Sequence, residues 1–166
     1  MNGSGIEIGA LYRPLPLPDH IHVKYLDYET RERSIDKFPE LNSGDIVDVD
    51  FIDNGFIMNK VPGKSQGFII ANYVLEHFPN FYGTLDNWTR VLKQDGVIFM
   101  SLPIAEHCFD KGSEFTSLNR MIEDYKLYCD NQSEQIINRN KKYLKEFRIK
   151  QYFWGMLPLK SLCLSS

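Results

Sequence analysis

The sequence predicts an α/β fold built on a mostly parallel sheet, and three observations support this class. Short apolar runs of strand length recur along the chain, separated by glycine- and proline-containing links and by helical periodicity. The run at 68–71 is apolar throughout and the run at 97–102 is apolar except for Ser101, which is typical of strands buried on both faces of a parallel sheet. The 166 residues, 43% hydrophobic and 25% charged, fit one ordinary globular domain.

Three strands are predicted in the first half of the chain. Gly5–Ala10 is an apolar run that ends in a glycine turn, and His22–Asp27 alternates and ends on an acid. Asp45–Asp50 alternates acidic with β-branched residues and is predicted as the third strand. Three prolines within Tyr12–Asp19 exclude a helix there and favour an extended path. Thr30–Phe38 is expected to form a short helix with its first threonine as N-cap.

Two more strands and one helix between them complete the predicted core at residues 1–110. Phe68–Ala71 and Val97–Leu102 are the fourth and fifth strands. Apolar positions at helical spacing predict a helix over Gly83–Lys93, which Asp95-Gly96 terminates.

A helical segment at 111–150 and an apolar tail at 151–166 are predicted after the core. Helices are expected over Ser117–Asp130 and Asn131–Arg148, because sparse apolar residues recur at helical spacing in both. The face expected to be apolar in the first of these helices consists of Leu118, Met121, Ile122 and Tyr125. The tail is rich in Phe, Trp, Leu and Met but has no clear period.

Charge and hydropathy argue against nucleic-acid and membrane partners. The net charge is −3, and the densest basic run, Arg139–Lys150, is interrupted by Glu146 and is interpreted as a solvated helix face. The sequence has no signal pattern and no uninterrupted apolar window of membrane-spanning length, so a cytoplasmic protein is expected.

Cysteine and histidine spacing predicts neither a disulfide framework nor a metal site. Cys108, Cys129 and Cys163 are far apart and form no CxxC pair. His20 and His22 alternate in an extended segment, but no third ligand lies within sequence reach.

In an open parallel sheet, ligands bind beyond the carboxyl ends of the strands, where the strand order reverses. The candidates are the residues at those ends: Gly9, Ala10, Asp27, Asp50 and Asn72. Gly9 lets a ligand approach the backbone without a Cβ in the way. Asp27 lies 27 − 9 = 18 positions later, close to the spacing of about 20 at which an acid meets ribose hydroxyls in dinucleotide folds. Asp50 could accept from an adenine amino group.

Other interpretations of these acids remain open. Asp27 could cap the turn before Glu29, and Asp48 or Asp53 could do the work assigned to Asp50. A lone Glu-x-Gly at a strand end also occurs for reasons of turn geometry alone.

The loop after the first strand distinguishes two classes of cofactor. A dinucleotide needs its pyrophosphate on a helix N-terminus behind a GxGxxG motif. Here the later glycines are missing, and the following segment is proline-rich instead of helical. S-adenosylmethionine carries no phosphate, so the residues favour this sulfonium nucleoside over a dinucleotide.

Several stretches together resemble a bacterial, type 11-like group of class I S-adenosylmethionine-dependent methyltransferase domains. The most specific is Phe68–His77, whose LEH segment follows the fourth strand in this group, with Arg90–Lys93 (RVLK) ending the next helix. The shorter matches are Glu7–Leu11, Val23–Asp27, Phe38–Leu41, Asp48–Asp50 and Gly112–Tyr125. The resemblance covers about residues 5 to 125 and implies a Rossmann-like sheet.

The resemblance also implies a set of cofactor contacts, from Glu7, Gly9, Ala10, Asp27, Asp50 and Asn72. The complete fold of the group has two further strands and usually a helix before the first strand. None of these is recognisable here, so a sheet truncated to five strands is expected, with an apolar edge that could drive homodimer formation. The chain departs from the group at Gly67, at Gln94-Asp95 and at Ile104–Cys108, and the last of these replaces a more basic stretch near the expected substrate side.

His77 and His107 are the candidate catalytic residues. Methyl transfer needs an acceptor positioned in line with the methyl group, and a general base only when the acceptor keeps its proton, as a hydroxyl does. Both histidines follow predicted strands, and histidine titrates near neutral pH. Glu76 is expected to orient or cap, and a structural contact at a helix start is the alternative role for His77.

The function expected from these residues is S-adenosylmethionine-dependent methyl transfer to a small-molecule or saccharide-linked acceptor. One alternative is a truncated or non-catalytic methyltransferase-like domain that keeps the fold and the cofactor pocket. The other is a Rossmann-like interaction domain that binds no cofactor.

Overall fold

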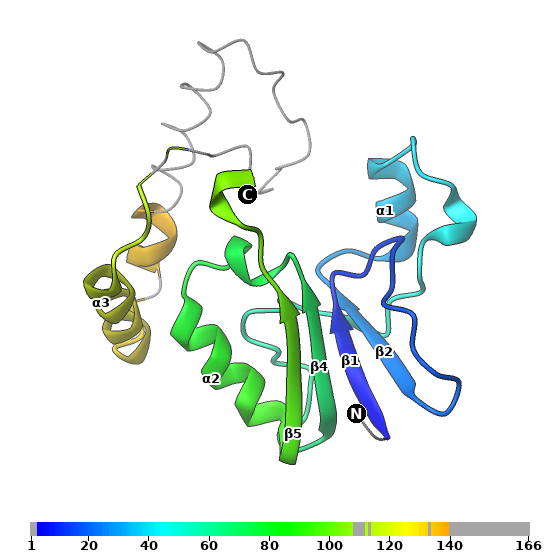
Figure 1. Cartoon of the computed structure of the whole chain (residues 1–166), viewed down its shortest axis with the longest axis horizontal. Helices are drawn as coiled ribbons and strands as arrows, with labels where there is room; N and C mark the ends of the chain where they lie inside the picture. Colours follow the sequence, from blue (N-terminus) through cyan, green and yellow to red (C-terminus); the bar gives the residue numbers. More distant parts are fainter. Residues whose placement is uncertain (1–2, 108–111, 113, 133, 140–166) are drawn as a thin grey trace.

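A computed structural model describes residues 3–107, 112, 114–132 and 134–139, which contain a five-stranded sheet (Figure 1). The strands are β1 Ser4–Ile8, β2 His22–Asp27, β3 Phe51–Ile52, β4 Gln66–Asn72 and β5 Leu92–Ser101. They lie in the order β3-β2-β1-β4-β5, and all neighbouring pairs are parallel. The predicted class is confirmed as a Rossmann-like α/β fold.

The strand order reverses between β1 and β4. From β1 the chain steps outward to β2 and β3, and it then crosses back to β4 and β5 on the other side of β1. Because all strands are parallel, their carboxyl ends meet along one edge of the sheet, called the rim below and uppermost in Figure 1. The rim between β1 and β4 is therefore where a ligand is expected in an open sheet of this kind.

Helices and short turns connect the strands. The elements found in the described residues are α1 Arg31–Lys37, η1 Ser43–Asp45, η2 Leu75–His77, α2 Phe81–Val91, η3 Ala105–His107 and α3 Leu118–Cys129. Helix α2 runs along the sheet beside β4 and β5, and α3 lies on the outer side of α2 (Figure 1). Residues 134–139 are also helical, whereas the first two residues of the predicted second helix, Asn131 and Gln132, are not. Residues 133 and 140–166, which include the apolar tail, lie outside the described residues.

The main core lies between α2 and one face of the sheet. Strand register aligns Ile6 with Ile69, so both side chains point to this face. Trp88 of α2 is fully buried against them, and its indole N–H donates to the Gly55 carbonyl over 2.8 Å. On the opposite face, Val97 and Phe99 of the edge strand β5 remain exposed. Homodimer formation through this edge stays a prediction.

The elements predicted before residue 39 are confirmed. β1 and β2 lie where apolar patterning placed them, and the segment 12–19 contains no helix. The Thr30 side chain accepts from the backbone N–H of Arg33 and caps α1, as predicted.

The third strand was predicted in the wrong place. Asp45–Asp50 does not join the sheet, and β3 comprises the two residues after it. The Val47 N–H donates to the Leu11 carbonyl, outside any strand ladder. The alternation of this segment thus reflects a loop in which Val47 and Val49 are half-buried while Asp48 and Asp50 are exposed.

The predicted end of the α2 helix was also wrong. The helix stops at Val91 instead of Lys93, and β5 begins at once with Leu92, whose partner in β4 is Gln66. The next paired residues are Phe68 and Val97, so β5 holds extra residues there, including Asp95 with a φ of +61°. The Asp95-Gly96 pair therefore forms an irregularity within the strand and does not terminate the helix.

Helix α3 forms as predicted, but only part of its predicted apolar face is covered, since Met121 and Tyr125 are half-buried. Leu118 and Ile122 are exposed, whereas the carboxylate of Asp124 is buried and pairs with Arg139. The Asn80 amide, which also caps α2, donates to the Asp124 carbonyl over 3.0 Å. Because the side of α2 that meets α3 is largely polar, the apolar spacing of α3 indicated only part of its buried face.

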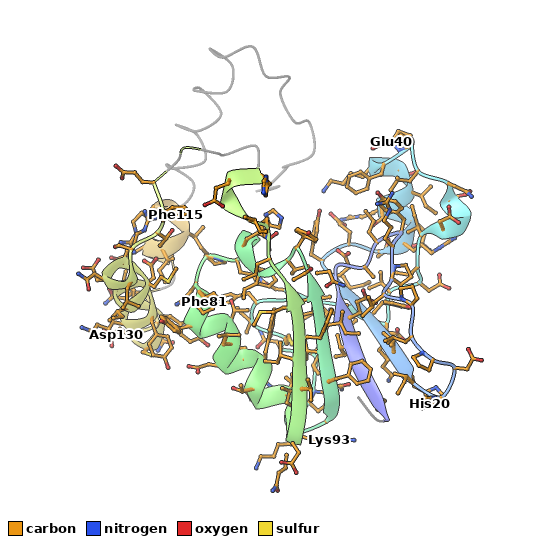
Figure 2. All side chains as sticks on the ribbon, viewed as in Figure 1. His20, Glu40, Phe81, Lys93, Phe115 and Asp130 are labelled. Atoms are coloured by element: carbon orange, nitrogen blue, oxygen red, sulfur yellow. The ribbon has the colours of Figure 1, made fainter. Side chains whose placement is uncertain are left out.

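The predictions on cysteines, metal-binding histidines and membrane helices can be compared with the described residues only. Among the described helices, none combines the length and apolar character needed to cross a bilayer. Cys129 is a free, exposed thiol, while Cys108 and Cys163 lie outside the described residues. His20 lies beyond the amino ends of the strands (Figure 2), and no three potential metal ligands gather within the residues that the structure describes.

Replacing Gly5 by alanine is expected to destabilise the fold. A Cβ there would lie 2.4 Å from the ring of Phe68, a fully buried side chain on the neighbouring strand. Overpacking of this kind costs about 1–3 kcal/mol. Urea denaturation of Gly5→Ala, Phe68→Leu and the double variant measures the energetic coupling between the two positions. Gly5→Ala should cost less stability in the Phe68→Leu background, because the smaller leucine relieves the clash. Strictly additive effects of the two substitutions would contradict the close approach of the two residues.

Candidate functional site at the carboxyl ends of the strands

The turn after β1 brings the β1 and β4 ends of the rim into contact. Gly9 has a φ of +66°, which favours glycine, and its N–H donates to the Leu26 carbonyl of β2 over 2.9 Å. A Cβ on Gly9 would lie 3.2 Å from Cγ2 of Val74, just after β4. Ala10 follows in the same turn, and Leu11 also has a positive φ of 51°. Little room separates this backbone from the β4 loop.

Asp27 ends β2 beside this turn and uses one carboxylate oxygen locally. Its Oδ1 accepts from the backbone N–H of Tyr28 at 2.7 Å and, more weakly, from that of Glu29 at 3.4 Å. The turn-capping role considered for Asp27 is therefore real, but it occupies Oδ1 only. Within the described residues, Oδ2 has no hydrogen-bond partner. Burial raises the pKa of the Asp27 carboxyl, while the Glu29 and Tyr28 N–H groups oppose that shift.

Asp50 was predicted to lie at the end of the third strand, but in the structure Asp53 takes that position. Asp50 precedes β3, and its Oδ2 accepts from the Tyr25 N–H at 2.8 Å, so this side chain is bound to the middle of β2. Asp53 directly follows β3, and its N–H donates to the Asp27 carbonyl over 2.9 Å. Asp53 thus takes the position next to Asp27 on the rim, because β3 begins later than the alternating acids predicted.

Glu7 lies within β1 and not on the rim. Its side chain is almost fully buried, and both carboxylate oxygens accept from the backbone N–H of Leu15, at 3.0 and 3.1 Å. Burial raises the pKa of the Glu7 carboxyl, and the Leu15 N–H opposes the shift. The observed contacts of Glu7 thus hold the proline-rich segment against the sheet.

Asn72 ends β4 and is tied to the end of β5. The Ser101 hydroxyl donates to Asn72 Oδ1 over 2.9 Å. The next residue, Tyr73, donates its N–H to the Ser101 carbonyl over 3.0 Å and has a φ of +55°. These two bonds join the β4 and β5 ends of the rim.

Both candidate catalytic histidines lie beyond the same end of the sheet, in η2 after β4 and in η3 after β5 (Figure 1). The His77 side chain is 55% exposed, and its Nε2 lies 4.0 Å from Oε1 of Glu76. The N–H of His107 donates to the Ile104 carbonyl. The two histidines therefore belong to the β4–β5 side of the rim, opposite the side that holds Asp27 and Asp53.

Sequence reasoning missed the residue that shapes the loop after Asp53. The guanidinium of Arg90 donates to the carbonyls of Ile57 and Met58, both at 2.9 Å, and to that of Val61 at 3.4 Å. Asp53 Oδ2 accepts from the Lys60 N–H in the same loop over 2.6 Å. The RVLK motif was noticed in the sequence, but nothing in it indicates which carbonyls the arginine reaches.

The raised pKa of Glu7 predicts a decline of stability with rising pH. Because the folded chain binds this proton more tightly than the unfolded chain, the free energy of unfolding falls as pH rises from the ordinary value of 4.5 through the raised pKa. Glu7→Gln keeps an oxygen for the Leu15 N–H but cannot ionise, so it should lose this part of the pH dependence. Urea denaturation at several pH values measures it, with the exposed Glu40→Gln as control. If the free energy of unfolding of Glu7→Gln depends on pH as steeply as that of the parent chain, the Glu7 carboxylate is not desolvated.

Among three comparisons with known proteins, the one with a family model supports the resemblance. A solved structure from Galdieria sulphuraria, titled a "putative sarcosine dimethylglycine methyltransferase", is similar with 20% sequence identity and a TM-score of 0.44. The match covers 58% of this chain and 38% of that one, so the chain spans well under half of that protein. No curated protein matches the chain. A family model described as a methyltransferase domain matches residues 3–100, more than half of the sequence. The chain therefore belongs to the methyltransferase domain family, as the motifs from the first strand to the RVLK helix had indicated.

Proposed function

We propose that this chain binds S-adenosylmethionine at the rim and transfers its methyl group to a small-molecule or saccharide-linked acceptor. The observation that carries the proposal is the open Oδ2 of Asp27 beside the Gly9 turn, in a chain that belongs to a methyltransferase family. A carboxylate oxygen accepts hydroxyl hydrogen bonds strongly, and a ribose presents two such hydroxyls.

The neighbouring residues fit a nucleoside cofactor of this kind. Asp53 lies next to Asp27, because its N–H donates to the Asp27 carbonyl. The two carboxylate oxygens of Asp53 accept from the N–H groups of Asn54 and Lys60, and each keeps a lone pair that could accept from an adenine amino group. The Gly9 backbone has no side chain to obstruct a ligand. No helix follows this turn, so it lacks the N-terminal amides that a pyrophosphate requires, and a dinucleotide fits less well.

When bound, S-adenosylmethionine supplies a methyl group on a positively charged sulfur. The chain would then hold an acceptor in line and exclude water, which is worth roughly 7–11 kcal/mol when the geometry is good. If the acceptor is a hydroxyl, the exposed imidazole of His77 would take its proton, and Glu76, 4.0 Å away, would orient the ring. His107 is the second candidate base, from η3.

Calorimetric titration with S-adenosylmethionine, with NADH as comparator, tests the cofactor assignment. Binding of the first and not of the second is expected. Tighter binding of NADH, or no binding of either, would contradict the proposal. Release of S-adenosylhomocysteine in the presence of acceptors then distinguishes an active enzyme from a non-catalytic binding domain, which would bind the cofactor without turnover.

A further inference from the structure

We propose that Tyr73 and Asn72 form the acceptor subsite and that it takes an uncharged, hydroxyl-bearing ring such as a sugar. This assigns Asn72 to the acceptor instead of the cofactor contact that the family resemblance implies. This inference rests on the proposed function, because it names the class of acceptor for the same rim.

Tyr73 lies on the acceptor side of the rim. Asp27 and Asp53, which would hold the nucleoside, follow β2 and β3, so the remainder of a bound cofactor extends past Gly9 toward β4. The close approach of Gly9 and Val74 places the β4 loop directly against the β1 turn. An acceptor that meets the transferred methyl group therefore arrives beside Tyr73.

The backbone of Tyr73 adopts a conformation that a tyrosine rarely takes. Its φ of +55° lies in the left-handed region, and the bond from its N–H to the Ser101 carbonyl holds it there. Glycine would adopt this conformation without strain, and strained residues of other types gather at functional sites. The ring is 59% exposed and makes no hydrogen bond or aromatic contact within the described part of the chain. No packing there explains the tyrosine, so its free ring is the feature to be accounted for.

The ring and the neighbouring amide together suit a sugar. An aromatic face packs well against the C–H face of a flat apolar or sugar ring. The Ser101 hydroxyl occupies Oδ1 of Asn72, which leaves the two Nδ2 hydrogens to donate to hydroxyl oxygens. One apolar surface beside neutral hydrogen-bonding groups matches a polyhydroxylated ring.

The charges of this part of the rim favour a neutral acceptor over an anion. The described segments 72–77 and 101–107 contain two glutamates and two histidines but neither lysine nor arginine. Phosphate and carboxylate groups are usually bound by arginine forks or lysines. A sugar phosphate or nucleotide sugar would instead meet Glu76 and Glu106.

Saturation-transfer NMR on protein saturated with S-adenosylhomocysteine tests the subsite. The probes are the methyl glycosides of glucose, mannose and rhamnose, with glucose 6-phosphate as the anionic comparator and p-cresol as the aromatic one. A methyl glycoside should bind, and Tyr73→Ala should weaken that binding about tenfold through loss of the ring contact. Tyr73→Phe should retain binding, and affinity for S-adenosylhomocysteine should be unchanged in both variants. Phe115→Ala, which removes an exposed aromatic ring ahead of α3 (Figure 2), should have no effect.

A stability comparison separates the ring from the backbone. Tyr73→Gly and Tyr73→Ala both lack the ring, but glycine tolerates the positive φ, so Tyr73→Gly should melt at the higher temperature while both lose the glycoside. The inference is overturned if S-adenosylhomocysteine binds but no glycoside does, if either comparator binds more tightly, or if Phe115→Ala has the same effect. Failure of S-adenosylhomocysteine to bind would overturn the proposed function itself.

Discussion

Asp27→Asn should lower the affinity for S-adenosylmethionine about 100-fold, by loss of hydrogen bonds to a charged group worth about 1.5–3 kcal/mol each. The substitution is selective, because the amide oxygen can still accept from the Tyr28 and Glu29 N–H groups as Oδ1 does. The amide nitrogen that replaces Oδ2 is a donor, so it opposes the ribose hydroxyls. Calorimetric titration measures the effect directly.

The same experiment has a matched control and an expected pH dependence. Asp36→Asn removes an exposed carboxylate on α1, and it should leave the affinity unchanged. Hydroxyl donors favour the ionised carboxylate, so in the parent chain affinity should rise with pH through the raised pKa of Asp27. This rise should be absent in Asp27→Asn. Equal affinity of the parent and Asp27→Asn would remove the ribose contact from the proposal.

Trp88→Ala should cost about 3–5 kcal/mol of stability, as expected for removal of a large aromatic side chain from a core. Trp88 is fully buried at the centre of the α2–sheet interface, and its indole N–H satisfies the buried carbonyl of Gly55. Total stabilities of domains are only about 5–15 kcal/mol. The variant should therefore be close to unfolding at room temperature.

Urea denaturation against two control variants identifies the origin of this loss. Trp88→Phe keeps an aromatic ring but leaves the Gly55 carbonyl without its donor, so it should cost about 1–3 kcal/mol. Thr89→Ala changes the next, exposed residue of the same helix and should stay within about 0.5 kcal/mol. A loss in Trp88→Ala no larger than that in Thr89→Ala would contradict the core position of the indole.

Local signals located those parts of the fold that depend on neighbours in sequence. Proline spacing kept residues 12–19 extended, the Thr30 hydroxyl capped α1, and the continuous apolar run at 68–71 marked the central strand β4. These local signals failed where pairing with residues distant in sequence decides whether a segment becomes a strand. Asp45–Asp50 alternates like a strand, yet its backbone bonds to Leu11 and Tyr25 outside a regular ladder, and only the next two residues join the sheet.

The candidate site divides in the same way. Gly9, Asp27 and Asn72 lie at the ends of strands whose apolar patterns are clear, and their places on the rim follow from those strands. The shift from Asp50 to Asp53 depends on the register of β2 with β3, which no local pattern reports. The three carbonyls that accept from Arg90 lie 29 to 33 residues away in sequence. They point toward the guanidinium only because the loop that carries them is folded.

The sequence by itself determined the parallel α/β class, the strands at both sides of the switch point and the family to which the chain belongs. These depend on hydrophobic periodicity and turn chemistry, which act between residues a few positions apart. Only the tertiary structure decided which acid meets Asp27, that Glu7 faces Leu15, and that Tyr73 stands free and strained on the rim. Each of these depends on a hydrogen bond between residues 8 to 28 positions apart, beyond the range of local patterning, and the partners meet only when the sheet assembles and buries its backbone polar groups.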